Sequence, residues 1–233
     1  MKKGFSIEDA ELLASDFRRQ MRLGEDDPVN LRALLADNGI ITLFRPMSGV
    51  NGMSLMSGGA RFMLINSNTT VGRQNFSIAH ELYHLYYDEN PEPHFNLSDE
   101  DSGEEKKANL FASALLLPRM SVYRIFKDVA YSTKIDYLEQ VIKAEQIFSV
   151  SHSCLVKRLY DLRMINVSQR ESLYRTPIRD ISQNLAMDVS IYNPGNENLF
   201  IGDYGIKAKK LFDAEKISEG HYNELLSLVN YGN

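Results

Sequence analysis

Two histidines four residues apart, His80 and His84, stand inside a segment whose apolar residues repeat with the period of a helix. The repeat predicts a helix over residues 72–87 with one face in a protein core, formed by Phe76, Ala79, Leu82, Tyr83 and Tyr86. Side chains four apart on a helix lie on the same face, so the two imidazoles point in one direction. Any fold for this chain must therefore accommodate a pair of polar rings on a largely buried helix, where unpaired polar groups are costly.

Glu81 follows the first histidine, which gives the pattern HExxH. Two imidazoles at this spacing can converge on one Zn²⁺ at about 2.0–2.1 Å each. Glu81, one step around the helix, can reach a water on the same ion and act as its general base. Zinc would lower the pKa of that water towards ~7 and polarise a scissile carbonyl, as amide hydrolysis requires. The alternative is a surface helix with two solvated histidines beside a solvated glutamate, which the apolar neighbours of the motif disfavour.

A catalytic zinc site usually has three protein ligands and one open position, so a third ligand is expected elsewhere in the chain. The extended motif HExxHxxGxxH is absent, because Tyr87 and Asn90 occupy the positions of its glycine and third histidine. The remaining candidates are acids on the next predicted helix, which begins near Glu104 and stops at Pro118. A zinc site of the His₂Glu type is therefore expected.

Glu105 is the expected third ligand. Ala108 and Ala112 follow it by three and seven residues, so its helix face carries small side chains that let a second helix approach closely. Glu104 lies about 100° away around the helix and is expected to be solvated.

Two alternatives to zinc binding by Glu105 remain open. Ser102 precedes it by three residues, as in a capping box, in which Glu105 would bond the first backbone N–H of its own helix. A glutamate in that role is not free to bind metal. His94, in the sequence Pro-Glu-Pro-His, is an alternative ligand on a loop that is predicted to be exposed.

Three segments carry a family resemblance: RFMLIN at 61–66, RQNFSIAHELYHLYY at 73–87 and EEKKANLFASALLLP at 104–118. They resemble the ImmA/IrrE family of intracellular metallopeptidases. That family has a strand ending in Asn, an R-x-x-F-(S/T)-x-A-H-E-(L/F)-x-H helix and an E-x-x-A-N-x-F-A-x-x-L-L-x-P helix. The resemblance extends more weakly over roughly residues 5–166. Many members have glycine where this chain has Tyr83; that position faces away from the metal, so a change in packing is expected and the chemistry is kept.

The resemblance implies an α+β, zincin-like fold of the gluzincin type over residues 1–120, with a small sheet. It also implies that His80, His84 and Glu105 hold Zn²⁺ and that Glu81 is the catalytic base. Several family members cleave or disable a helix-turn-helix repressor encoded next to them and so relieve transcriptional repression. The predicted function is therefore a zinc-dependent intracellular endopeptidase acting on such a repressor. One alternative is a non-proteolytic regulator of the same shape that binds a repressor or toxin, and a second is a DNA-binding regulator.

The chemistry also needs a transition-state stabiliser and a place for the substrate. Candidates for the stabiliser are Tyr86, Tyr87, Tyr123 and His152. If the predicted strand at 61–66 is an exposed sheet edge beside the metal helix, an extended substrate could pair with it by β-addition.

Residues 121–233 are predicted to form a second, mainly helical region. Within it, residues 137–165 are typical of two helices joined by a turn near 149–151, an arrangement similar to a helix-turn-helix. In a DNA-binding interpretation Lys157, Arg158 and Arg163 would face phosphates. The segment holds four basic side chains against three acids, which is few for phosphate neutralisation. Packing on the peptidase domain or docking of the protein substrate is therefore favoured.

The charge of the chain points away from nucleic acid as its main partner. The net charge is −5, whereas nucleic-acid-binding domains are usually strongly basic. The segment from Asp88 to Glu105 carries eight acids and no Lys or Arg, and is expected to be a solvated loop. Such a loop could also steer a basic protein partner towards the metal.

Cysteine use and hydropathy indicate a soluble cytoplasmic protein. Cys154 is the one cysteine, so an internal disulfide and a Cys-based zinc cage are excluded, and the thiol is expected in the core. No stretch approaches the roughly 18–20 apolar residues of a membrane span. The first residues carry two acids where a secretory peptide needs its apolar run.

The other elements follow from periodicity and turn residues. The sequence predicts helices at 7–24 and 29–38, a strand at 40–44, a hairpin or flexible loop at 49–60, helices over most of 120–185, two strands within 186–203 and one final helix at 207–229.

Overall fold

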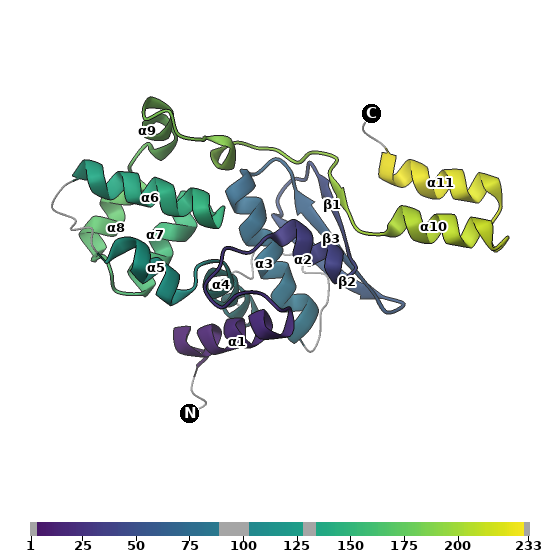
Figure 1. The fold of residues 1–233 in the computed structure, drawn as a ribbon, viewed down its shortest axis with the longest axis horizontal. Coiled ribbons are helices and arrows are strands. Elements are labelled where there is room, and N and C mark those ends of the chain that lie inside the picture. Colours follow the sequence, from purple (N-terminus) through teal and green to yellow (C-terminus); the bar gives the residue numbers. More distant parts are fainter. Residues whose placement is uncertain (1–3, 89–102, 128–133, 231–233) are drawn as a thin grey trace.

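The computed structural model describes residues 4–88, 103–127 and 134–230. A four-stranded sheet packs against α3 (Val71–Tyr87), α3 packs against α4 (Gly103–Leu116), and α4 packs against α1 (Ile7–Gln20). A mainly helical region lies beside these layers, and a helical pair at the C-terminus lies beyond the sheet (Figure 1). The predicted α+β class, with a small sheet and a mainly helical C-terminal part, is confirmed.

The predicted N-terminal elements are confirmed with shorter bounds. Helix α1 begins after Ser6, whose hydroxyl accepts from the backbone N–H of Asp9, while the Asp9 carboxylate accepts from the Ser6 N–H. This reciprocal pair satisfies two N–H groups that a helix start leaves free. Helix α2 (Leu31–Asp37) is capped by Asn30 and ends before Gly39. Gly39 has a φ of +63°, a backbone conformation that glycine adopts easily because it has no Cβ.

The sheet has the strand order β2-β3-β1-β4. Strand β1 (Ile40–Arg45) runs parallel to β3 (Ala60–Asn66), and β2 (Gly52–Ser57) pairs antiparallel with β3. Strand β3 is therefore an interior strand, so the condition set for β-addition at 61–66, an exposed sheet edge, is not met. The edge beside α3 is β2, which the glycine-rich sequence of 49–60 had left open between a hairpin and a flexible loop.

Helix α3 is capped by Thr70, whose hydroxyl accepts from the backbone N–H of Arg73. Gly72 allows a close approach, because a Cβ there would lie 2.6 Å from the backbone N of Ser151. Asn75 adds a hydrogen bond from its side-chain nitrogen to the Ser149 carbonyl at 2.7 Å. The start of α3 is thus joined to the turn between α6 (Lys134–Phe148) and α7 (His152–Asp161).

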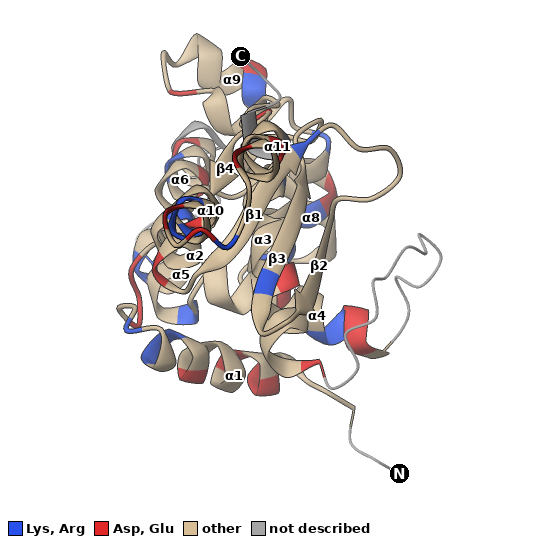
Figure 2. Ribbon diagram, turned by 90° about the vertical axis from the view of Figure 1, so that its right-hand side faces the viewer, with Lys and Arg blue, Asp and Glu red and all other residues tan. Residues whose placement is uncertain are grey.

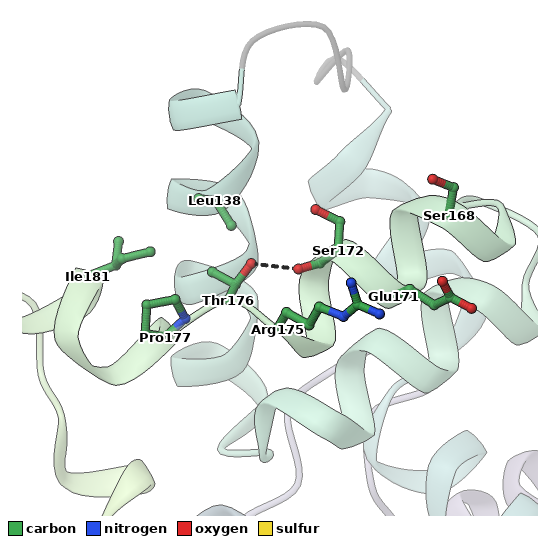
Figure 3. Close-up of a pocket in the computed structure, with 8 residues that line it drawn as sticks. All are labelled: Leu138, Ser168, Glu171, Ser172, Arg175, Thr176, Pro177 and Ile181. Atoms are coloured by element: carbon green, nitrogen blue, oxygen red, sulfur yellow. Dashed lines mark hydrogen bonds between the residues drawn. The ribbon is translucent and has the colours of Figure 1, made fainter.

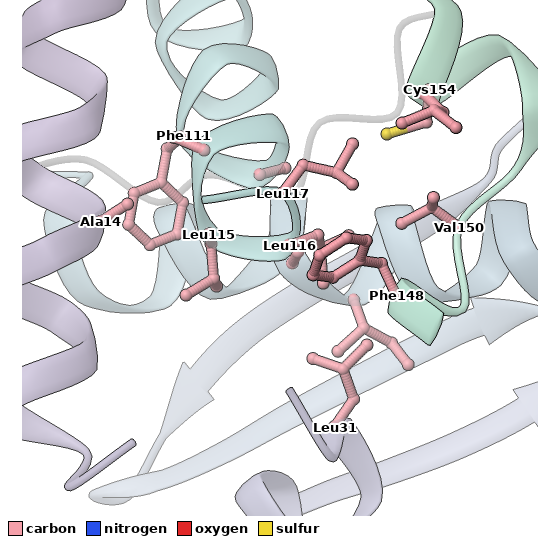
Figure 4. Packing of buried hydrophobic residues seen from close by; sticks show 14 of the residues in the cluster. Ala14, Leu31, Phe111, Leu115, Leu116, Leu117, Phe148, Val150 and Cys154 are labelled. Carbon is pink, nitrogen blue, oxygen red and sulfur yellow. The ribbon is translucent and has the colours of Figure 1, made fainter. Parts of the chain in front are cut away.

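One hydrophobic core runs through the layers and into the helical region. Phe17 of α1 meets Phe111 of α4 edge to face, with ring centroids 5.5 Å apart. Figure 4 shows Leu115, Leu116 and Leu117 at the end of α4 between Phe111 and the residues Phe148, Val150 and Cys154 of the helical region. Cys154 is buried, as predicted, and burial raises the pKa of its thiol to about 12. A division into domains at residue 120 stays a prediction.

The helical region continues with α5 (Arg119–Phe126), α8 (Val167–Tyr174) and α9 (Ile178–Asn184). The two helices predicted within 137–165 are α6 and α7. Arg158 of α7 is 2% exposed, donates to the Leu117 carbonyl at 3.0 Å and pairs with Glu11 at 2.8 Å. It therefore does not face solvent as a phosphate contact would, and that part of the DNA-binding interpretation is wrong. Side chains of both charges lie on α1 and on α10 (Figure 2).

The C-terminal predictions are partly wrong. Residues 186–203 contain one short strand, β4 (Phe200–Ile201), which pairs antiparallel with β1, and the 3₁₀ turn η1 (Ser190–Tyr192). The predicted final helix is two helices, α10 (Tyr204–Asp213) and α11 (Glu219–Asn230). The chain reverses at Glu215, with φ +55°, and Phe212 stacks on Tyr222 at 5.0 Å. Within the described residues, no helix combines the length and apolar character needed to cross a membrane.

Replacement of Arg158 should destabilise the fold strongly. Arg158→Met leaves the Leu117 carbonyl and part of the Glu11 carboxylate without their buried partner, which typically costs about 3–5 kcal/mol of unfolding free energy. Lys157→Met is the matched control, because that ammonium is 56% exposed and its pairing with Asp161 is worth at most about 1 kcal/mol. Urea unfolding of both variants measures the difference, and equal small losses would contradict the role assigned to Arg158.

Candidate metal centre

His80 and His84 lie one helical turn apart on α3, and their Nε2 atoms are 3.2 Å from each other. Glu105 of α4 faces both rings: its Oε2 lies 3.0 Å from Nε2 of His80 and its Oε1 3.3 Å from Nε2 of His84. One ligand atom from each of the three residues lies within 4.8 Å of the others. Two imidazole nitrogens and one carboxylate are a donor set that could hold a metal ion.

The outer nitrogens of both rings are bonded in a way that suits metal binding. Nδ1 of His80 lies 3.1 Å from Oδ1 of Asn109, and Nδ1 of His84 lies 2.9 Å from Oδ2 of Asp88. An acceptor at Nδ1 fixes the proton there and leaves Nε2 free to ligate, as is general for metal-binding histidines. The ring orientations and tautomers therefore fit the metal that the donor set implies.

The charges of this cluster depend on one another. Burial favours neutral His84, but the carboxylates of Glu105 and Asp88 outweigh it and raise the His84 pKa to about 9. Hydrogen bonds from His80 and His84 hold the pKa of Glu105 well below its usual range. Glu105 is thus an anion at neutral pH, as a metal ligand must be.

Glu81 points from the same helix towards the edge strand β2. It is 8% exposed, and its Oε2 accepts a hydrogen bond from the Ser54 hydroxyl at 2.7 Å. Gly52 makes room for it, since a Cβ at residue 52 would lie 3.3 Å from both Cγ and Oε1 of Glu81. The carboxylate is therefore held between α3 and β2, beside the histidine pair.

The alternatives to zinc binding by Glu105 involve Ser102 and His94, which lie outside the described residues. The Glu105 carboxylate itself faces the histidines. Glu104 is 43% exposed, yet it also accepts from the Tyr83 hydroxyl at 2.8 Å and pairs with Lys107. Its exposure agrees with the expectation of a solvated carboxylate, to which these two contacts are added. The acidic loop likewise falls largely outside the described residues, at 89–102.

The Tyr83 ring meets the His84 ring edge to face, with centroids 5.6 Å apart, so it packs beside one of the two histidines. The Tyr83 ring also lies 5.8 Å from Phe111 and 5.9 Å from Tyr87, between α3 and α4. Burial, together with its bond to Glu104, raises the pKa of its hydroxyl. The tyrosine thus takes a packing position on the helix.

The four candidate transition-state stabilisers make contacts elsewhere. Tyr86 packs under Arg61, and Tyr87 meets Phe17 edge to face. The Tyr123 hydroxyl points to the Leu162 carbonyl at 3.4 Å. Both ring nitrogens of His152 are bonded, Nδ1 to Glu145 at 2.6 Å and Nε2 to the Leu173 carbonyl at 2.8 Å. The described contacts of these side chains give none of them a position at the histidine cluster.

Three site residues were not predicted from the sequence. Asn109 belongs to the E-x-x-A-N motif, and its place four residues after Glu105 put it on the same helix face. Asp88 follows His84 by four residues and could have been found in the same way. Ser54 had no local signal, because its contact with Glu81 depends on the pairing of β2.

A pocket elsewhere in the molecule holds none of the predicted site residues. It lies between α6, α8 and the start of α9, around Arg175, Glu171 and the Thr176 hydroxyl, which donates to the Ser172 carbonyl (Figure 3).

Comparison with known proteins supports this assignment of the cluster. Residues 36–160, more than half of the chain, match the IrrE N-terminal-like domain, a peptidase family. The chain belongs to this family. The match contains α3, α4 and β2 and confirms the resemblance to ImmA/IrrE proteins. Membership indicates a metallopeptidase-like or regulatory role.

Two further comparisons add little to the family assignment. A solved structure, a Mycobacterium tuberculosis transcriptional regulator, is similar with a TM-score of 0.47 and 16% identity. The similarity covers 66% of this chain and 47% of that one, so the chain spans about half the length of the regulator. No curated protein matches.

Metal binding should release a proton. The raised pKa of His84, about 9, means that the metal-free ring is protonated at pH 7, and a ligating imidazole must be neutral. The apparent zinc affinity should therefore rise about tenfold per pH unit and level off near pH 9. Calorimetry in two buffers of different ionisation enthalpy should show about one proton released at pH 7.

Asp88→Asn is the matched variant for this measurement. It keeps the shape of the side chain but removes a carboxylate that raises the His84 pKa, so the affinity should level off at a lower pH. An affinity that does not change between pH 6 and 8 in the unmodified chain would contradict the assignment.

Proposed function

We propose that the chain is a zinc-dependent intracellular endopeptidase that cleaves a helix-turn-helix repressor and so relieves transcriptional repression. The observation that supports it best is the convergence of His80, His84 and Glu105 within 4.8 Å, with the Glu81 carboxylate beside them. Membership in a peptidase family supports the reaction class. The repressor as substrate follows from the resemblance to ImmA/IrrE proteins.

The proposed reaction divides the work among a few side chains. Zinc held by His80, His84 and Glu105 would supply an acidified water and a polarised scissile carbonyl. Glu81 would take the proton of the water as the water oxygen bonds to the carbonyl carbon, and would deliver that proton to the amine nitrogen as the C–N bond breaks. The Ser54 hydroxyl orients that carboxylate, and the bonds at Nδ1 keep the two histidine rings in place.

The proposed substrate path follows β2 in place of β3. Strand β2 is an edge of the sheet, packs against α3 and carries Ser54, which binds Glu81. Its outer backbone groups can pair with an extended peptide, and the neighbouring Met56, 49% exposed, offers apolar surface. An unfolded or linker segment of a repressor meets this requirement better than a folded surface.

Removal of the base should separate catalysis from metal binding. Glu81→Gln should lower kcat by about 10²–10⁴-fold, because general-base catalysis contributes that much, while the zinc content stays near one per chain. The measurement is zinc quantification together with cleavage of the repressor encoded beside the gene, with and without a chelator.

The outcomes of this experiment distinguish the functions. Cleavage by the unmodified chain alone, abolished by the chelator, supports the peptidase. Zinc without cleavage, together with repressor binding that Glu81→Gln leaves intact, would favour the non-proteolytic regulator. A chain that binds no zinc would overturn the proposal.

Ser54 should affect turnover more than substrate binding. Ser54→Ala removes a hydrogen bond to a charged group, so kcat should fall by about tenfold with KM little changed. Ser54→Thr keeps the hydroxyl and should restore most of the loss. Ser57→Ala, on the same strand, is the control, because within the described part of the chain its side chain makes no hydrogen bond. A similar loss in both alanine variants would indicate a general effect on β2.

A further inference from the structure

Arg73 lies on the same face of α3 as His80, two helical turns nearer the start of the helix. The seven-residue spacing places it about 10 Å from His80 along the helix axis. Its guanidinium is exposed, and its Nε donates to Oδ1 of Asn51 at 3.1 Å. Asn51 directly precedes β2, so this pair joins the first turn of α3 to the start of the edge strand.

Strand β2 and helix α3 run in the same direction. Asn51 contacts Arg73 and, three residues later, Ser54 contacts Glu81. Three residues of strand span about 10 Å, and the eight residues of helix from 73 to 81 span about 12 Å. The distance between the two contacts is therefore similar along both elements. A peptide paired with β2 near Glu81 therefore extends towards Arg73 at one of its ends.

The Arg73 side chain is available for a ligand. Its two terminal nitrogens have no partner among the residues that the structure describes, while Nε is held by Asn51. A positive charge in the first turn is unfavourable for the helix, so helix stability does not explain the arginine. A guanidinium held by one nitrogen, with two parallel N–H groups open, matches the geometry of a carboxylate.

We propose that Arg73 and Asn51 form a subsite for a carboxylate of the peptide substrate; this inference rests on the proposed peptidase function. The subsite lies about 10 Å from the site of cleavage, which is about three residues of extended chain. Antiparallel pairing, the more common arrangement, puts the C-terminal side of the peptide near Asn51. The preferred substrate therefore carries Asp or Glu about three residues after the scissile bond.

The test uses binding and cleavage together on the full chain loaded with zinc. A pool of proteome-derived peptides is passed over immobilised Glu81→Gln, and the retained peptides are sequenced. The same pool is digested with the unmodified chain to map the cleavage sites. Arg73→Glu is added to both forms, and Arg32→Glu is the matched control, because Arg32 is also an exposed arginine bonded to an asparagine, Asn196.

Retained peptides should be enriched about tenfold in Asp or Glu, a typical effect of one charged hydrogen-bonded pair, and Arg73→Glu should abolish or reverse the enrichment. Arg32→Glu should leave it unchanged. Cleavage sites should show the acid about three residues after the cut. An enrichment that is absent, survives Arg73→Glu, or lies before the cut would overturn the subsite. Acid-dependent retention through Arg73 without any cleavage would instead support the subsite and overturn the peptidase function.

Discussion

The close packing of α4 on α3 is the constraint on which the candidate site depends. Phe111 of α4 packs on Tyr83 and Tyr87 of α3, and Ala108 and Ala112 on α4 are fully buried. This packing lets Glu105 reach the histidine pair. The same approach brings Asn109 to the outer nitrogen of His80. A larger side chain at either alanine would separate the helices. Glu105 would then move away from the histidines, and Asn109 would move away from Nδ1 of His80. One packing contact therefore sets the geometry of a polar cluster.

That cluster could be predicted from sequence to the extent that its geometry is local. The phase of a helix places His80, Glu81 and His84 without any knowledge of the fold, and small residues after Glu105 indicated a second helix that could come close. Asp88 lies four residues after His84 and Asn109 four residues after Glu105, so the same helix periodicity could have identified both. Ser54 could not be identified in this way, because its contact with Glu81 depends on which strand lies at the sheet edge.

The errors in the fold have similar causes. Strand order is decided by pairing between distant segments, so the sequence around residues 61–66 could not show that β3 has a neighbour on each side. The final helix was predicted as one over 207–229, and no Gly or Pro marks the position at which the chain reverses. The reversal at Glu215 is stabilised by the Phe212–Tyr222 stack, a contact between the two halves. Arg158 looked like a surface cation because its partners, Glu11 and the Leu117 carbonyl, are far away in the sequence.

Strand β4 has a consequence for how the chain folds during synthesis. It covers the outer edge of β1 with residues 200–201, about 160 positions further along the chain, and Phe44 also exchanges backbone hydrogen bonds with residues 198 and 199. Contacts between such distant segments form slowly, because the intervening chain must first be ordered. A nascent chain that has reached residue 160, where the family match ends, already holds the whole histidine cluster but has an unpaired β1 edge. An open edge can pair with another chain, so the growing protein is exposed to aggregation until residues 200–201 are made and cover that edge.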